Sequence, residues 1–173
     1  EKFTFIAVGR LEIVKNHKFL IEIANELKGT YDFEIRIVGH GYLKEELENL
    51  IQKYNLENYV KLLGLRNDIP QLLSKAHCLL MPSLWEGLPI VILEAGASSL
   101  PVLSTPVGSI PSLLNDDNAY LCELDSYKSK MIDVLENYEI AQQKGKKLFE
   151  EIVKKYSIEA VIEAHEKIYK DLV

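Results

Sequence analysis

The chain has 173 residues, 47% of them hydrophobic and 27% charged, with a formal net charge of −6 at pH 7. This size and composition are typical of one soluble globular domain with its own core, and the acidic balance argues against nonspecific binding to nucleic acid. No stretch has the length of a membrane-spanning helix or the pattern of a signal peptide. The cysteines Cys78 and Cys122 have neither metal nor redox spacing, so we expect reduced, packed thiols in a cytoplasmic protein.

Short apolar runs alternate with amphipathic segments along the chain. The runs predict buried strands at 3–9, 32–39, 59–64, 77–83, 100–105 and 118–123. The segments between them have apolar residues at helical spacing and predict helices at 16–29, 42–56, 68–76, 88–99 and 109–114. Asp68 is the expected N-cap of its helix, and Pro89 lies near the first turn of the next. From about residue 125 we expect two helices, broken near Ser157.

This alternation predicts a single α/β domain over residues 1–173, a doubly wound, Rossmann-like parallel sheet covered on both faces. In such folds ligands bind at the carboxyl ends of the strands, where the strand order switches. The turns after the predicted strands are therefore the places to search for a site.

The turn VGRLEIVKN (8–16) carries two bases, Arg10 and Lys15, on either side of a short loop. Arginine offers a planar fork of donors to phosphate oxygens, and lysine adds a compact positive charge. The pair can therefore serve one anion. The alternative is two solvated surface bases.

The next two turns are less specific. Gly39 and Gly41 form a Gly-x-Gly turn, which suits either a close approach of ligand to backbone or simply a tight turn. Leu65 and Arg66 follow the third strand, where backbone groups can bind a base edge and the arginine can reach phosphate. The alternative there is an ordinary turn capped by Asp68.

The strongest signal is LWEGLPIVILEAG (84–96), where Glu94 interrupts an apolar helical run. A helix start offers free amides and partial positive charge to an anion. Helical side chains lean toward the amino end, so Glu94 is expected to reach a ligand there and to suit two neighbouring hydroxyls, such as a ribose diol. Glu86 precedes it by eight positions and is expected to accept from further hydroxyls or to face developing positive charge. The alternative is that Glu94 pairs with an internal base while Glu86 is solvated.

Together these motifs resemble the carboxyl-terminal, donor-binding domain of retaining group 1 nucleotide-sugar glycosyltransferases, which have the two-domain GT-B fold. The resemblance spans about residues 5–125 and depends on segments that occur in the family's order: VGRLEIVKN, IVGHG, VKLLGLRNDIPQLLSKA, LLMPSLWEGLPIVILEAGASSLPVLST and VGSIPSLL. Two positions depart from the family pattern: Ser109, where a second glycine is frequent, and Ser99, where a glycine is frequent.

The resemblance implies a role for each matching residue. Arg10 and Lys15 hold the donor diphosphate and stabilise it as a leaving group, Glu86 touches the donor sugar, and Glu94 binds the ribose. Arg10, Lys15 and Glu86 are the implied catalytic residues. The implied donor-binding residues are Gly9, Gly39, Gly41, Leu65, Arg66, Ser83, Gly87, Leu88, Pro89 and Glu94.

The resemblance also implies what accompanies the site. No Asp-x-Asp motif occurs, so we expect no metal and no other cofactor, with a nucleotide-sugar, from family frequency a UDP-sugar, as substrate. The chain opens without Met in a strand-like run, which suggests an excised piece whose amino-terminal, acceptor-binding half is absent. That half would supply the acceptor site and any peripheral attachment to the inner face of the membrane. Two alternatives stay open: a non-catalytic nucleotide-binding module, and half of a GT-B epimerase or phosphorylase.

Overall fold

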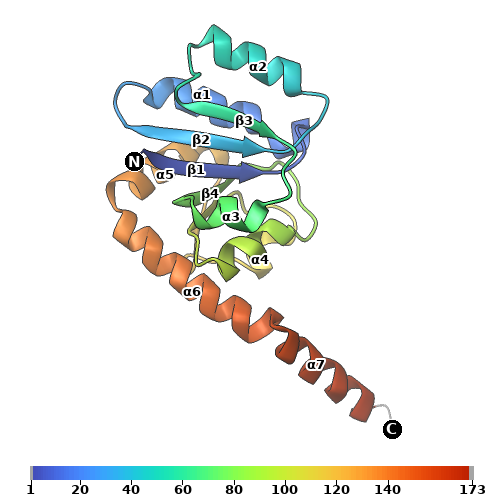
Figure 1. The fold of residues 1–173 in the computed structure, drawn as a ribbon. Helices are drawn as coiled ribbons and strands as arrows, with labels where there is room; N and C mark the ends of the chain where they lie inside the picture. The colour runs from blue at the N-terminus through green and yellow to red at the C-terminus, as the bar shows by residue number, and fades with distance from the viewer. Residues whose placement is uncertain (1, 172–173) are drawn as a thin grey trace.

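The computed structural model describes residues 2–171, which form a parallel sheet with helices on both faces (Figure 1). The strands are ordered β3-β2-β1-β4-β5-β6, and every neighbouring pair is parallel. The strands are β1 (Phe3–Val8), β2 (Phe33–Val38), β3 (Val60–Gly64), β4 (Cys78–Met81), β5 (Val102–Ser104) and β6 (Tyr120–Leu121). The chain winds outward from β1 to β3 and then returns to the other side of β1. The strand order therefore switches between β1 and β4.

The connections are helical, as predicted. The helices are α1 (His17–Leu27), α2 (Lys44–Lys53), α3 (Ile69–Ser74), α4 (Ile90–Ala97), α5 (Leu124–Glu136), α6 (Tyr138–Tyr156) and α7 (Ile158–Asp171), with 3₁₀ turns η1 (Ile13–Lys15) and η2 (Ile110–Ser112). The predicted doubly wound α/β fold is confirmed.

The prediction of two carboxyl-terminal helices is wrong, because this part of the chain forms three helices, α5, α6 and α7. The break at Ser157 is present, where the backbone is extended. A second break at Asn137, whose φ of −125° and ψ of 47° lie outside the helical region, separates α5 from α6. Asparagine competes for helical hydrogen bonds through its side chain, and here its amide bonds the Asp133 carboxylate one turn back.

The core has two layers because successive residues of a strand face opposite sides of the sheet. Phe5 and Ala7 of β1 pack with α1, α2 and α5 on one face. Ile6, between them, packs with α3, α4 and α6 on the other. Cys78 is buried in β4 and Cys122 half-buried beside β6, both as free thiols, in agreement with the expectation of packed cysteines.

α6 packs against α4, and α7 then continues away from the sheet (Figure 1). Ile158 and Ile162 of α7 are exposed. Within residues 2–171, no helix combines the length and the apolar composition that crossing a membrane requires.

Because α6 packs closely on the segment after α4, we expect one added methyl group at Gly145 to destabilise the fold. A Cβ at buried Gly145 would overlap the carbonyl oxygen of Ser99. We expect Gly145→Ala to lower the free energy of unfolding by about 1–3 kcal/mol, although alanine favours a helix over glycine by about 1 kcal/mol. Urea denaturation followed by circular dichroism measures this. Gln143→Ala, on the exposed face of α6, is the control, and an equally stable Gly145→Ala would contradict the packing argument.

Candidate functional site

The predicted site residues lie at the carboxyl ends of β1, β2, β3 and β4, beside the switch in strand order. The turn after β1 holds Arg10 and Lys15, and the turn after β4 holds Glu86. β1 and β4 pair directly in the sheet. Two segments far apart in the sequence therefore meet at this edge.

An ion pair between a buried carboxylate and a partly buried lysine joins these two turns. The Lys15 Nζ atom lies 2.6 and 2.8 Å from the two carboxylate oxygens of Glu86. The Ser83 hydroxyl donates a further hydrogen bond of 2.6 Å to the same carboxylate. The Glu86 side chain is only 6% exposed and that of Lys15 25%. The alternative of a solvated Glu86 is therefore wrong, because its charge is compensated inside the fold.

The turn after β5 supports this pair from the other side. The Thr105 hydroxyl donates a hydrogen bond of 2.6 Å to the carbonyl oxygen of Ser83. Gly108 has a φ of 57°, and an added Cβ would overlap the carbonyl oxygen of Glu86. A larger residue at position 108 would push against the backbone that carries the carboxylate.

Beside the ion pair, a cleft of about 270 Å³ opens above β1, β2 and β3. Its lining residues are Val8, Gly9, Arg10, Val38, Gly39, His40, Leu65, Arg66 and Ile69. The cleft and the ion pair meet at Gly9, where an added Cβ would lie 3.3 Å from Cδ of Lys15. The structure thus brings five of the predicted residues into one cleft next to Lys15.

The two arginines of the cleft have partners within the fold. Arg10 is 70% exposed and lies 2.6 Å from the Glu12 carboxylate, so only Lys15 of the predicted base pair is turned inward. Arg66 donates two hydrogen bonds, of 2.8 and 2.7 Å, to Asp68. Asp68 occupies the N-cap position of α3 as predicted, but its carboxylate makes no capping hydrogen bond because it binds Arg66 instead.

The two glycines of the second turn are required by packing. A Cβ at Gly39, which has a φ of 147°, would overlap the carbonyl oxygen of Gly9, and one at Gly41 would overlap that of Leu11. The turn after β2 therefore lies directly on the turn after β1. This contact agrees with the tight-turn interpretation of Gly39 and Gly41 and leaves their part in ligand binding as a prediction.

The start of α4 has the geometry expected from the sequence. Pro89 is the N-cap, with an extended backbone and no capping side chain, and Gly87 and Leu88 are exposed just before it. Glu94 is half-buried in α4. Within residues 2–171, its carboxylate has no hydrogen bond or ion pair. The alternative in which Glu94 pairs with an internal base is therefore wrong.

His17 belongs to this region but was not predicted from the sequence. It is the first residue of α1, 4% exposed, and neither ring nitrogen has a hydrogen-bond partner among the described residues. Burial lowers the pKa of His17 from 6.5 to about 4, the nearby carbonyls of Gly9 and Arg10 oppose the shift, and the charge of Lys15 adds to it. The helical spacing of the sequence could have indicated that His17 is buried, because residues 17, 20, 21 and 24 share one buried face of α1.

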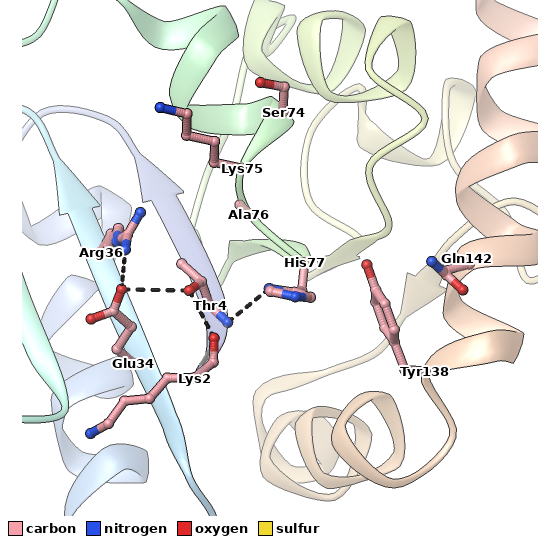
Figure 2. A pocket seen from close by; sticks show the side chains of 10 residues that line it. All are labelled: Lys2, Thr4, Glu34, Arg36, Ser74, Lys75, Ala76, His77, Tyr138 and Gln142. Atoms are coloured by element: carbon pink, nitrogen blue, oxygen red, sulfur yellow. Dashed lines mark hydrogen bonds and ion pairs between the residues drawn. The ribbon is translucent and has the colours of Figure 1, made fainter.

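A larger hollow, of about 820 Å³, lies at the opposite edge of the sheet. Figure 2 shows Arg36 and Lys75 on one side of it and Tyr138 and Gln142 on the other. Arg36 pairs with Glu34 there. The hollow contains none of the predicted site residues and lies at the amino ends of the strands, so it is not the candidate site. In residues 2–171, no group of three or more His, Cys, Asp or Glu side chains is placed to hold a metal ion.

Comparison with known proteins finds matches in sequence and in fold. The family model for glycosyl transferases group 1 matches residues 1–151. A galactosyltransferase of Escherichia coli, the UDP-Gal:alpha-D-GlcNAc-diphosphoundecaprenol alpha-1,3-galactosyltransferase, is 32% identical over 99% of this chain and 46% of its own. The N-acetyl-alpha-D-glucosaminyl L-malate synthase of Bacillus anthracis is 25% identical over 97% of this chain and 45% of its own. The chain thus spans less than half the length of these relatives.

Solved structures share the fold. TarM from S. aureus, crystallised with UDP among other ligands, superposes with a TM-score of 0.86 at 25% identity, over 97% of this chain and 35% of its own. The carboxyl-terminal domain of a group 1 glycosyl transferase from Francisella tularensis has a TM-score of 0.79 at 23% identity, over 90% of this chain and 87% of its own.

The ion pair predicts a specific loss of stability. Lys15→Ala leaves the buried Glu86 carboxylate with only Ser83, and we expect the free energy of unfolding to fall by about 1–3 kcal/mol, since Lys15 is partly exposed. Lys18→Ala is the control, because its pair with Glu46 lies on the surface and should contribute less than about 0.5 kcal/mol. Urea denaturation at pH 7 measures both. Equal losses in the two variants would contradict a buried pair.

His17 predicts a dependence of stability on pH. Its pKa is lower in the folded state, so below pH 6.5 the unfolded chain takes up a proton that the folded chain does not. We expect this residue to contribute a loss of about 3 kcal/mol between pH 7 and pH 4. Denaturation at several pH values compares the wild type with His17→Gln, which should lose this component. The exposed His40 provides the control, His40→Gln, which should retain it; a wild-type pH profile in His17→Gln would contradict the prediction.

Proposed function

Because the chain belongs to the group 1 glycosyl transferases, whose family model matches residues 1–151, we propose that residues 1–173 are the donor-binding half of a retaining enzyme. The reaction moves a hexosyl unit from a nucleotide diphosphate to an acceptor. The observation that carries the proposal is the buried Lys15–Glu86 pair beside a cleft built from predicted donor-binding residues. Burying such a pair is costly, so its place beside the cleft supports a role in binding a charged ligand.

Three parts of the site suit successive parts of a nucleotide-sugar: the base, the ribose and the diphosphate with its sugar. The cleft between Gly9, Gly39 and Leu65 has a largely apolar lining and space for a flat base. Glu94, an acceptor without a partner among the described residues, suits the ribose hydroxyls. The amides at the uncapped start of α4, after Gly87, suit phosphate or the sugar.

The chemistry follows from where charge develops. Departure of the nucleoside diphosphate concentrates negative charge on phosphate oxygens, and preorganised positive charge lowers that barrier. Lys15 supplies such a charge, already held in place, and Arg10 can leave Glu12 to add a second. Glu86 already accepts three hydrogen bonds from Lys15 and Ser83. In our proposal it accepts from a sugar hydroxyl and holds Lys15, rather than giving a proton to the leaving group.

In our proposal the acceptor binds outside this chain. The E. coli relative is named for transfer to a lipid-linked acceptor, GlcNAc-diphosphoundecaprenol. By analogy, we propose a lipid-linked or glycan acceptor in polysaccharide or glycoconjugate synthesis. An amino-terminal half would bind this acceptor, at the cytoplasmic face of a membrane. The donor nucleotide is proposed to be UDP, with which TarM was crystallised.

The rival proposal, a non-catalytic nucleotide-binding module, predicts the same binding site. It differs in turnover. In the full-length protein, hydrolysis or transfer of the donor sugar that is abolished by Lys15→Ala supports the transferase, whereas nucleotide binding with no turnover supports the module.

Calorimetric titration of this chain with UDP, GDP and ADP, without added metal, tests the site itself. We expect one nucleotide to be preferred, and its affinity to fall at least about tenfold in Lys15→Ala and in Glu94→Ala, because each removes a charged hydrogen-bonding group. Glu150→Ala, an exposed carboxylate in α6, is the control and should bind as the wild type does. Unchanged affinity in both site variants would contradict the proposed contacts.

A further inference from the structure

Three contacts join the turn after β1 to the turn after β4, and Lys15 lies in the middle of them. The backbone amide of Leu84 donates to the carbonyl oxygen of Val14 at 2.8 Å. The side-chain amide of Asn16 donates to the carbonyl oxygen of Pro82 at 3.1 Å. The third contact is the ion pair itself. Both chain neighbours of Lys15 are therefore tied to the segment that carries its carboxylate partner.

Asn16 has a backbone that few residues adopt. Its φ of 56° and ψ of 35° lie in the left-handed region, which glycine enters freely and asparagine tolerates better than most other residues. This conformation ends η1, where the backbone amide of Asn16 donates to the carbonyl oxygen of Ile13 at 3.1 Å. It also lets α1 begin at the next residue. Glycine would supply the conformation alone, whereas asparagine supplies the conformation and the bond to Pro82.

We propose that Asn16 is a positioning residue, which holds the Lys15 ammonium group at Glu86 by tying the two turns together. The proposal rests on the proposed function, since Lys15 is there the group that meets the donor diphosphate. Lysine has a flexible four-carbon side chain, so its ammonium group is well placed only if the backbone at its base is fixed. Val14 and Asn16 provide that fixed base on either side.

The substitution Asn16→Gly separates the two features of this residue. It keeps the left-handed backbone accessible and removes the bond to Pro82. The chain offers a matched control in Asn55, which is exposed, has a φ of 52° and makes no side-chain hydrogen bond among the described residues. Asn55→Gly therefore makes the same chemical change at a left-handed position far from the site.

The first measurement needs no ligand. An amine-acylating reagent modifies lysines according to their freedom and exposure, and mass spectrometry compares Lys15 with Lys18 in the same molecule. We expect Asn16→Gly to raise the rate ratio of Lys15 to Lys18 about fivefold, the effect of losing one hydrogen bond, while Asn55→Gly leaves it unchanged. An unchanged ratio in Asn16→Gly overturns the proposal.

The second measurement is UDP affinity in a double-mutant cycle. Asn16→Gly is expected to weaken UDP binding about fivefold in the wild-type background and not at all in Lys15→Ala, because its effect acts through Lys15. An equal loss in both backgrounds overturns the proposed role. If the wild type binds no nucleotide while the labelling ratio still rises, the nucleotide site fails and the placement of Lys15 by Asn16 stands.

Discussion

The buried pair between Lys15 and Glu86 is the interaction on which the arrangement of the site depends. Removing a carboxylate from water is costly unless its charge is matched and its oxygens are hydrogen-bonded. Here Lys15 and Ser83 satisfy both conditions. Three turns, after β1, β4 and β5, must therefore keep a fixed relation to one another, which explains why polar contacts between them are so dense.

Small residues make this relation possible. Gly39 and Gly41 let the turn after β2 lie on the turn after β1, and Gly108 lets the turn after β5 lie on Glu86. At each of these glycines an added Cβ would overlap backbone atoms of the neighbouring turn, which have little freedom to move aside. The polar contacts and the close backbone packing thus act together to hold the three turns in one arrangement.

This fixed arrangement of the turns relates the structure to the proposed chemistry. A leaving diphosphate is best stabilised by charge that does not have to move into place. Lys15 is already oriented, whereas Arg10 and Glu94 are the groups left available, one in a surface pair and one without a partner among the described residues. The Lys15 side chain borders the cleft at Gly9, and in our proposal its charge meets the donor diphosphate there.

The sequence by itself determined the fold class, the six strands, the turns that carry the site and the contrast of Glu94 with its apolar helix, because these follow from local periodicity and from the residue types at strand ends. It did not show that Glu86 is the buried carboxylate, that Lys15 is its partner, or that Asn16 bonds the Pro82 carbonyl. Those facts depend on the pairing of β1 with β4, which brings together residues 71 positions apart. Local patterns hold no information on such a contact, so only the tertiary structure decided which charges meet.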